Sequence, residues 1–251
     1  MKNEDRLEYE AKFHDNNDDR LKARRLSSLM VGDLFNEPHN HVFNVVREEC
    51  PDKSVLCYGC GEGTFIHEML FYGAKSITGI DISPGMIEKA SSLFDDQRVN
   101  FLIMNCEQTE FDNNSFDLIV GIAILHHLDL NRAITEIHRL LKPGGKAIFL
   151  EPLGHNIFIN LFRRLTPHAR TPFEHPLKMG DISLIKAVFK RAATKEYVFL
   201  PLLAIPLKFM LPRNVFLKII NRLSKIDNFL LQHLVFLRYW FWIIVLELPK
   251  E

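Results

Sequence analysis

Three glycines at alternate positions interrupt an apolar run early in the chain. The stretch VLCYGCGEGTF begins like a buried strand and then places Gly59, Gly61 and Gly63 just before residues with helical spacing. Because glycine carries no side chain, backbone amides in such a turn can approach a ligand closely. These amides and the start of the following helix favour an anionic group, so the stretch predicts a ligand-binding turn.

A carboxylate stands at the end of the next apolar run. Asp81 comes directly after Ser76–Ile80, and ligands of open α/β sheets sit beyond the carboxyl ends of the strands. An acid in this place accepts hydrogen bonds from ribose hydroxyls, so the turn and Asp81 together predict a nucleoside-bearing cofactor. The G-x-G-x-G spacing differs from the G-x-G-x-x-G fingerprint of dinucleotide sites, which argues against NAD.

Further titratable side chains follow the later apolar runs, on the ligand side of the predicted sheet. His126 and His127 follow the run Phe116–Gly121. Glu151 ends the run Lys146–Glu151, and His155 follows it. Such groups can serve as a general base, and these four residues are the catalytic candidates. Loop histidines with no part in the chemistry are the alternative.

The cysteines and the remaining histidines do not form a metal-binding pattern. Cys57 and Cys60 make a C-x-x-C motif, but no second ligand pair follows at a suitable spacing. The histidines between residues 151 and 176 lack the helix-borne spacing of metal ligands. The sequence therefore predicts no metal site and ordinary buried thiols.

The composition excludes several classes of protein. Lys and Arg number 31 and so do Asp and Glu, so the formal net charge is zero, and no basic excess indicates a nucleic-acid partner. The charged N-terminal stretch is not a signal peptide, and the four cysteines, if reduced, fit a cytoplasmic protein. The oligomeric state stays open.

The elements that must position these residues follow a regular rhythm. Apolar runs alternate with segments of helical spacing between about residues 45 and 151, which predicts a parallel sheet covered by helices on both faces. The expected strands are Ser54–Tyr58, Ser76–Ile80, Val99–Met104, Phe116–Gly121 and Lys146–Glu151. The expected helices are Thr64–Phe71, Pro84–Phe94 and Asn131–Leu141.

The last hundred residues have a different character. Their prolines and apolar runs predict the antiparallel edge of the sheet with an inserted helical cap, including a helix over Asp181–Arg191 that Asp181 caps. Further strands are expected over Glu196–Leu203 and Tyr239–Leu246, with a helix over Arg213–Leu231. The uninterrupted run at 239–246 is too short to span a bilayer as a helix, which leaves peripheral membrane contact open.

Four motifs in this order resemble those of class I S-adenosylmethionine-dependent methyltransferases, in the small-molecule branch that includes quinone-biosynthesis enzymes. They are VLCYGCGEGTF, GIDIS, FDNNSFDLIVGIAILHHL and LLKPGGKAIFLEP, and they cover about residues 53–152. The resemblance implies a Rossmann-like, doubly wound, mostly parallel seven-stranded sheet with an antiparallel C-terminal edge. It also implies S-adenosylmethionine as cofactor, S-adenosylhomocysteine as product and a small-molecule acceptor that is lipophilic, glycan- or lipid-linked, or quinone-like.

We expect a single domain in which residues 1–45 form a helical lid, 46–152 the cofactor-binding core, and 153–251 the substrate cap with the C-terminal strands. Tyr9–Asp15 would fold over the bound cofactor, with an ordinary surface helix as the alternative. The resemblance also implies a role for each site residue. The cofactor would be held by the glycine turn at its methionine end, by an acid at the ribose, and by residues after the third and fourth strands at the adenine and sulfonium. These residues are Cys57, Gly59, Cys60, Gly61, Asp81, Ile82, Asn105, Cys106, Gly121 and Ile122.

Cys57 and Asn105 depart from the family pattern, which usually has an acid at each place. Asn105 can still accept a hydrogen bond from an exocyclic amine through its carbonyl oxygen. Cys57 lacks the charge that helps to position the cofactor, so either the affinity for the cofactor is lower or another acid, such as Glu62, takes its place. Two other functions remain as alternatives: an NAD-dependent oxidoreductase and a non-catalytic protein that binds a nucleoside cofactor.

Overall fold

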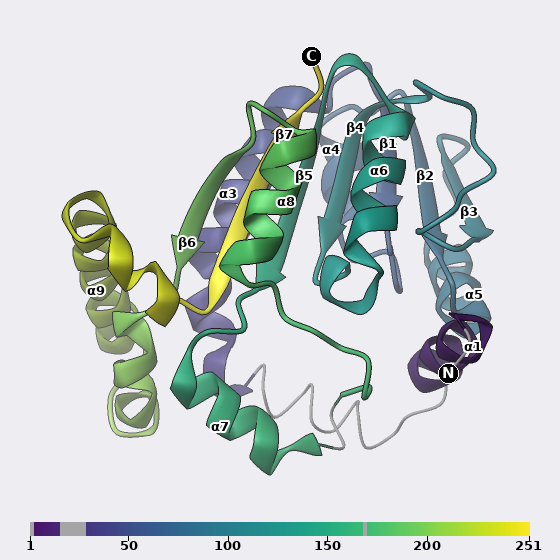
Figure 1. The fold of residues 1–251 in the computed structure, drawn as a ribbon. Coiled ribbons are helices and arrows are strands. Elements are labelled where there is room, and N and C mark those ends of the chain that lie inside the picture. Colours follow the sequence, from purple (N-terminus) through teal and green to yellow (C-terminus); the bar gives the residue numbers. More distant parts are fainter. Residues whose placement is uncertain (1–2, 16–28, 168–169) are drawn as a thin grey trace.

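A seven-stranded sheet forms the centre of the protein. The computed structural model describes residues 3–15, 29–167 and 170–251. The strand order is β3-β2-β1-β4-β5-β7-β6, in which β7 runs antiparallel to both of its neighbours and the other pairs are parallel. This arrangement confirms the predicted doubly wound sheet with an antiparallel C-terminal edge (Figure 1). The strands are β1 (Ser54–Tyr58), β2 (Ser76–Asp81), β3 (Val99–Ile103), β4 (Phe116–Ile122), β5 (Leu141–Pro152), β6 (Ala193–Tyr197) and β7 (Ile243–Pro249).

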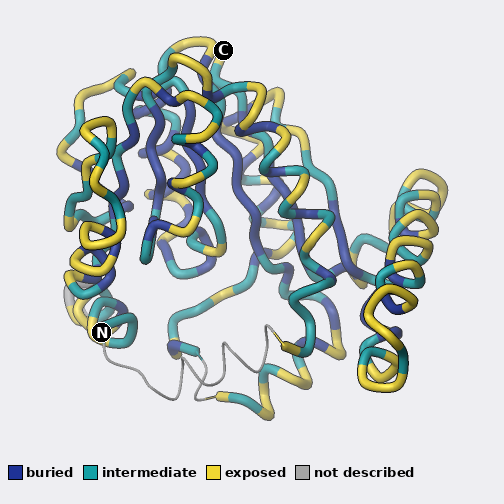
Figure 2. The backbone as a smooth tube through the Cα atoms, turned by 180° about the vertical axis from the view of Figure 1, so that it is seen from behind, coloured by how far each residue is buried: buried dark blue, intermediate teal, exposed yellow. Residues whose placement is uncertain are grey.

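Helices cover both faces of this sheet. Helices α3 and α4 pack on one face and α6 and α8 on the other (Figure 1), as right-handed crossovers between parallel strands require. The strands are buried while the outer sides of the helices are exposed (Figure 2). The helices are α1 (Asn3–Asp15), η1 (Gly32–Phe35), α3 (Asn36–Glu49), α4 (Ile66–Phe71), α5 (Pro84–Leu93), η2 (Leu125–His127), α6 (Leu130–Leu140), α7 (Ile157–Leu165), α8 (Met179–Val188), η4 (Leu200–Phe209), α9 (Arg213–His233) and η5 (Val235–Trp240).

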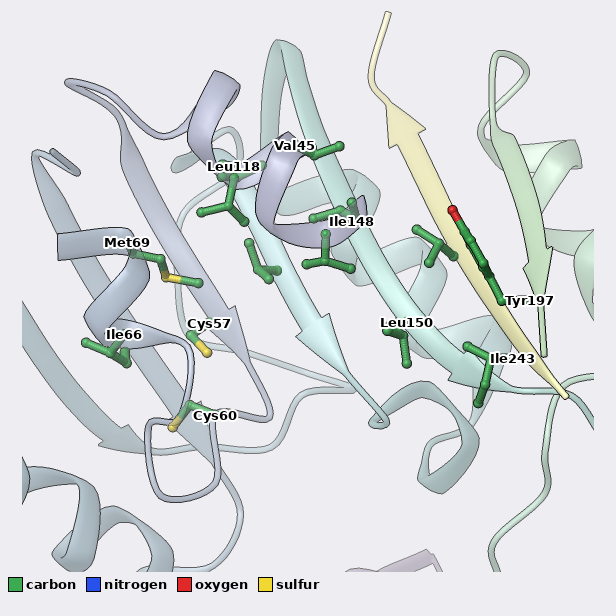
Figure 3. Close-up of a cluster of buried hydrophobic side chains, with 14 of the residues drawn as sticks. Val45, Cys57, Cys60, Ile66, Met69, Leu118, Ile148, Leu150, Tyr197 and Ile243 are labelled. Carbon is green, nitrogen blue, oxygen red and sulfur yellow. The ribbon is translucent and has the colours of Figure 1, made fainter. Parts of the chain in front are cut away.

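Alternation along β1 divides the core into two layers. Val55 and Cys57 point into the cluster under α3 and α4, whereas Leu56 and Tyr58 point into the cluster under α6 and α8, because successive strand residues face opposite sides of a sheet. Figure 3 shows the first cluster, with the sulfur of Cys57 close to the end of β1. The strand thus needs apolar residues on both faces, which explains its continuous apolar sequence.

The C-terminal part differs from the expected element boundaries. The strand expected over Glu196–Leu203 is β6, which ends at Tyr197, and residues 200–209 form the 3-10 helix η4 instead. Buried Asp227 from α9 accepts hydrogen bonds from the amides of Phe199 and Leu200 at 2.9 and 3.0 Å and fixes this helix start. A contact between residues so far apart in the chain leaves no local signal in the sequence.

Two further boundaries were also wrong. The last strand begins at Ile243, not at Tyr239, because residues 235–240 form η5. Helix α8 begins at Met179, so Asp181 lies inside its first turn and is not the residue that precedes the helix. Asp181 nevertheless accepts a hydrogen bond from the backbone amide of Lys178 at 2.7 Å, so it still stabilises the helix start.

The predicted cap consists of α7, η4, α9 and η5. Helix α9 packs against η4 and η5 beside the antiparallel edge, and α7 lies beyond the lower ends of the strands (Figure 1). Within the described ranges, no helix combines the length and the apolar character needed to cross a bilayer. Helix α3, in contrast, contacts β5 and β7 and so supports the sheet.

A glycine in β4 is fixed by close packing between neighbouring strands. A Cβ added to Gly121 would lie 2.4 Å from the ring of Phe149 and 2.9 Å from the side chain of Ile124. We therefore expect Gly121→Ala to lower the free energy of unfolding by about 1–3 kcal/mol, the usual cost of overpacking a core. Urea unfolding measures this. Gly180→Ala, where a new Cβ meets no described atom within 4 Å, is the control and should not destabilise; equal stability of Gly121→Ala and the parent would contradict the packing.

Candidate functional site

The turn after β1 has a backbone that only glycine adopts easily. Gly59, Gly61 and Gly63 have φ angles of 68°, 52° and 81°, in the left-handed region that disfavours other residues. Gly59 is also crowded, since a Cβ there would lie 2.5 Å from the side chain of Ile124. Because these positions carry no side chains, the backbone of the turn can contact a ligand in the space beyond the end of β1.

Asp81 joins this turn to the next one. Its Oδ2 accepts a hydrogen bond from the amide of Gly61 at 2.9 Å, and its Oδ1 accepts one from the amide of Ser83 at 3.0 Å. A carboxylate has about four acceptor positions, so two remain for a ligand. The glycine turn and the acid thus lie side by side, as the sequence predicts.

A cavity of about 600 Å³ opens at the carboxyl ends of β1, β2 and β4. Of the ten predicted cofactor-binding residues, the cavity wall includes all except Gly121, whose Cα faces Phe149. The wall also includes residues of α1 and α3 that the sequence did not single out for this role. The lining is Arg6, Leu7, Glu10, Phe13, His14, His39, Phe43, Cys57, Gly59, Cys60, Gly61, Glu62, Thr64, Phe65, Asp81, Ile82, Met86, Asn105, Cys106, Val120, Ile122, Ala123, Ile124, His126, His127, Leu128 and Glu174.

The thiols in the cavity wall are neutral. Burial raises the pKa of Cys57 to about 12, and it also raises the pKa values of Cys60 and Cys106. Cys57 therefore provides no negative charge where the resembling enzymes usually have an acid. Glu62 lies in the same wall and has Lys89 3.8 Å away, so a carboxylate is present on the turn itself.

Helix α1 closes one side of the cavity through contacts with three loops. Arg6 donates a hydrogen bond to the carbonyl of His127 at 2.8 Å and pairs with Glu107. At the other end of the helix, Asp15 accepts a hydrogen bond from the amide of Gly85 at 2.8 Å. Helix α1 thus lies over one side of the cavity; that it acts as a lid stays a prediction, and residues 16–28 of the predicted lid lie outside the described residues.

His126 is buried between two carboxylates. Its Nδ1 lies 2.7 Å from Glu151, and its Nε2 lies 3.4 Å from Glu174. Glu151 also accepts hydrogen bonds from the backbone amides of Ile124 and Leu125, at the start of η2. Burial alone would lower the pKa of His126, but the hydrogen bonds and charges of Glu151 and Glu174 outweigh it and raise the pKa to about 9. His126 is thus protonated at neutral pH and cannot accept a proton there.

His127 is the opposite case. Burial and the charge of His126 lower its pKa despite the attraction of Glu10, so its imidazole is neutral at pH 7. Its Nδ1 lies 3.3 Å from Glu10 Oε2, and both atoms are buried without a hydrogen bond to any described residue. Its Nε2 lies 3.8 Å from Glu174 Oε1. With a proton on Nδ1 facing Glu10, Nε2 carries the lone pair and is the ring atom that can accept a proton.

The structure brings together three of the four catalytic candidates. Glu151 is fully buried behind His126 and does not line the cavity, so it can act only by positioning His126. His155 lies apart from the cavity wall, where its Nε2 accepts a hydrogen bond from the amide of Met179 at 2.9 Å and its ring packs against Tyr239. Of the four, only His126 and His127 reach the cavity.

Two overlapping sets of side chains have ligand atoms within 4.8 Å of one another, close enough for a single metal ion to reach each set. They are Glu10, His14 and His127, and His126, His127 and Glu174. Glu10 and His14 lie in the stretch Tyr9–Asp15 that was expected near the cofactor, but neither they nor Glu174 was expected among the site residues. The spacing of Glu10 and His14, one helical turn apart, was the available signal, but only the fold brings that turn against His127.

The fold and the cavity define a Rossmann-like domain with a nucleoside-type site at the carboxyl ends of its strands. Residues 56–149 match a family described as a methyltransferase domain. The chain is 29% identical over 158 residues to a demethylmenaquinone methyltransferase of Staphylococcus epidermidis, covering 58% of this chain and 64% of that protein. It is 35% identical over 101 residues to a ubiquinone biosynthesis O-methyltransferase of Coxiella burnetii, covering 39% and 42%.

Solved structures share the fold. A phosphoethanolamine N-methyltransferase 2 of Haemonchus contortus, determined with phosphomonomethylethanolamine and S-adenosylhomocysteine, has a TM-score of 0.60 and 19% identity, over 84% of this chain and 52% of that one. The matches confirm the resemblance to small-molecule class I methyltransferases. Because the chain spans less than two thirds of the curated relatives described above, their activities do not transfer directly to it.

The raised pKa of His126 makes part of the stability depend on pH. The folded pKa of about 9 exceeds the ordinary histidine value of 6.5, so this contribution is complete below about pH 6.5 and is lost as the pH rises to about 9. We expect His126→Gln to lower the melting temperature most at pH 6 and progressively less towards pH 9, in thermal unfolding followed by circular dichroism. His233→Gln, at an exposed position on α9, should show no such trend. A gap between parent and His126→Gln that is constant over this range would contradict the ion-pair assignment.

Proposed function

We propose that the protein is an S-adenosylmethionine-dependent methyltransferase acting on a small molecule. The observation that carries this proposal is the single cavity that joins the glycine turn, Asp81 and His127. It combines a site for a nucleoside with a neutral imidazole in the same wall. The methyltransferase-domain match over residues 56–149 supports the choice of cofactor.

The residues present suit such a cofactor. The backbone of Gly59–Gly61 is open to the cavity, and the Asp81 carboxylate keeps free acceptor positions beside it. Asn105 and Ile82 would meet the adenine, and Glu62 would offer a negative charge to the amino end in place of Cys57. When bound, the cofactor supplies a methyl group already activated on a sulfonium.

The protein then has to align the acceptor, exclude water and take up a proton where the acceptor loses one. His127 is suited to the last task, since it is neutral and Glu10 orients its Nδ1 side. His126, held protonated between Glu151 and Glu174, would instead fix η2 and keep Glu174 ionised. His155, away from the cavity wall, is no longer among the candidates that we propose for catalysis.

The acceptor that we propose is lipophilic and contains a planar ring. Phe43 and Phe65 stack at 5.1 Å in the cavity wall, and His39 packs against Phe65. The quinone-modifying activities named for two relatives agree with a flat apolar acceptor. The free thiols of all four cysteines support a location in the reducing cytoplasm.

Asp81 gives a direct test of the cofactor site. Asp81→Asn should weaken S-adenosylhomocysteine binding by about ten- to a hundredfold, the worth of a charged hydrogen-bond acceptor, measured by titration calorimetry. Asp117→Asn is the matched control, because Asp117 also accepts a strand-joining amide hydrogen bond, from Ser54, but lies outside the cavity wall. It should leave the affinity unchanged. If the parent binds NAD and neither sulfur compound, the protein is not a methyltransferase.

His127 gives a test of the chemistry. With labelled S-adenosylmethionine and a demethylated naphthoquinol as acceptor, His127→Gln should lower kcat about a hundredfold or more, as expected for loss of a general base, without changing S-adenosylhomocysteine affinity. His155→Gln, away from the cavity, is the control and should retain kcat. Equal kcat for parent and His127→Gln would rule out His127 as the base, and cofactor binding without turnover of any acceptor would favour a non-catalytic binding protein.

A further inference from the structure

Exposed apolar side chains gather on the cap. Of the 23 exposed large hydrophobic residues among the described part of the chain, 17 belong to α7, η4, α9, η5 or the residues that adjoin them. Water-soluble surfaces seldom carry so large a cluster unless it binds something. We call it the cap surface: Ile157, Phe158, Leu161, Phe162, Leu165, Leu203, Leu207, Phe209, Met210, Val215, Ile226, Phe229, Leu234, Val235, Phe236, Tyr239 and Trp240.

Helix α7 turns its apolar side outward. Leu161 and Leu165 are 57% and 74% exposed, one helical turn apart. On the inner side, Arg163 donates a hydrogen bond to Glu174 at 2.7 Å. An ordinary surface helix of a globular protein turns its apolar side towards the core. Helix α7 instead presents apolar side chains to the surroundings of the protein.

The other cap elements continue this surface. The ring of Phe158 on α7 lies 6.5 Å from that of Trp240 on η5, and η5 in turn packs against α9. Phe236 on η5 is 64% exposed and Met210, after η4, is 76% exposed. Figures 1 and 2 show α7 and α9 as the outlying helices, with exposed residues along their outer sides.

Cations outnumber acids within the cap elements. The four cap elements contain eight Lys or Arg and a single acid, Asp227, which is buried. Lys218, Arg222 and Lys225 are exposed at helical spacing on α9. These three make no ion pair with a described residue, unlike Arg163, Lys208, Arg213 and Arg238, which do.

We propose that the cap surface binds peripherally to a lipid bilayer that contains anionic lipids. Apolar and aromatic residues would enter the boundary between headgroups and acyl chains, and the α9 cations would meet lipid phosphates. Tyr239 and Trp240 have the amphipathic rings that favour this interfacial depth. A protein partner would need acidic groups opposite the cations and a surface that fits both α7 and α9. An anionic bilayer supplies the negative charge and adapts to the shape of the two helices.

The cap surface lies next to the cavity wall. Arg163 of α7 pairs with Glu174, which lies 3.4 Å from His126 and in the cavity wall. We infer that a lipophilic acceptor would reach the cavity from the bilayer by a route beside α7. This route rests on the proposed function, but the docking itself does not, since vesicle binding needs neither cofactor nor acceptor.

The test is vesicle cosedimentation of the full chain with phosphatidylcholine alone or mixed with phosphatidylglycerol. The parent should bind the anionic vesicles and release from them at high salt. Lys218→Gln with Arg222→Gln should weaken that binding about thirtyfold, since each cation near the surface contributes about a factor of five. Leu161→Ser with Leu165→Ser should weaken it about a hundredfold.

Matched controls use exposed residues outside the cap surface. Phe71→Ser on α4, which is 83% exposed, and Lys75→Gln with Arg191→Gln should bind vesicles like the parent. The proposal is overturned if the parent binds neither kind of vesicle, or if the cap variants bind vesicles as strongly as the parent does. It is also overturned if the parent forms a dimer and binds no lipid, and Leu161→Ser with Leu165→Ser abolishes that dimer. Calorimetry with S-adenosylhomocysteine separates these outcomes from a failure of the proposed function.

Discussion

The hydrogen bond between the Asp81 carboxylate and the amide of Gly61 is the contact on which the site depends. At 2.9 Å it joins the loops that follow two neighbouring parallel strands, and the second oxygen of the same group holds Ser83 at the start of α5. The glycine turn keeps its left-handed backbone because no side chain obstructs it. The buried thiols and the other residues of the cavity wall lie next to these two turns at the carboxyl ends of the strands.

Local sequence was enough to predict this half of the protein. The strands from β1 to β4 and the second half of β5 contain apolar runs, so the order of the elements and the position of Asp81 follow from short-range patterns. The start of β5 does not: it begins at Leu141, before the predicted Lys146, and includes the lysine, proline and glycine residues 142–145. The register of the antiparallel edge was less accessible. Asp227 on α9 accepts hydrogen bonds at the start of η4 from residues 27 and 28 positions away in the chain, which no local pattern predicts. The last strand begins only at Ile243 because residues 235–240 form η5, although their apolar sequence resembles a strand.

The ionisable residues of the site were also only partly predictable from local sequence. His126 and His127 were recognisable from their place after β4, but their different protonation could not be read from two adjacent histidines. Glu151 on β5 and Glu174 beyond α7 raise the pKa of His126, whereas burial and the charge of His126 lower the pKa of His127 despite Glu10 on α1. These segments meet only in the folded protein. Burial makes each contact strong, since an unpaired charge in that environment would be costly. His155 was misplaced for the opposite reason: its position in the sequence suited the site, but the chain after β5 leads it away.

The position of β7 has a consequence for how the chain is made. Among the described strands it comes last in sequence, yet it lies between β5 and β6 and is the one described strand that pairs with β6. During synthesis from the N-terminus, the edge of β5 and the strand β6 stay without their partner β7 until residues 243–249 leave the ribosome. Unpaired edges are prone to stick to other chains, so the nascent polypeptide passes through a vulnerable stage that the finished molecule no longer displays.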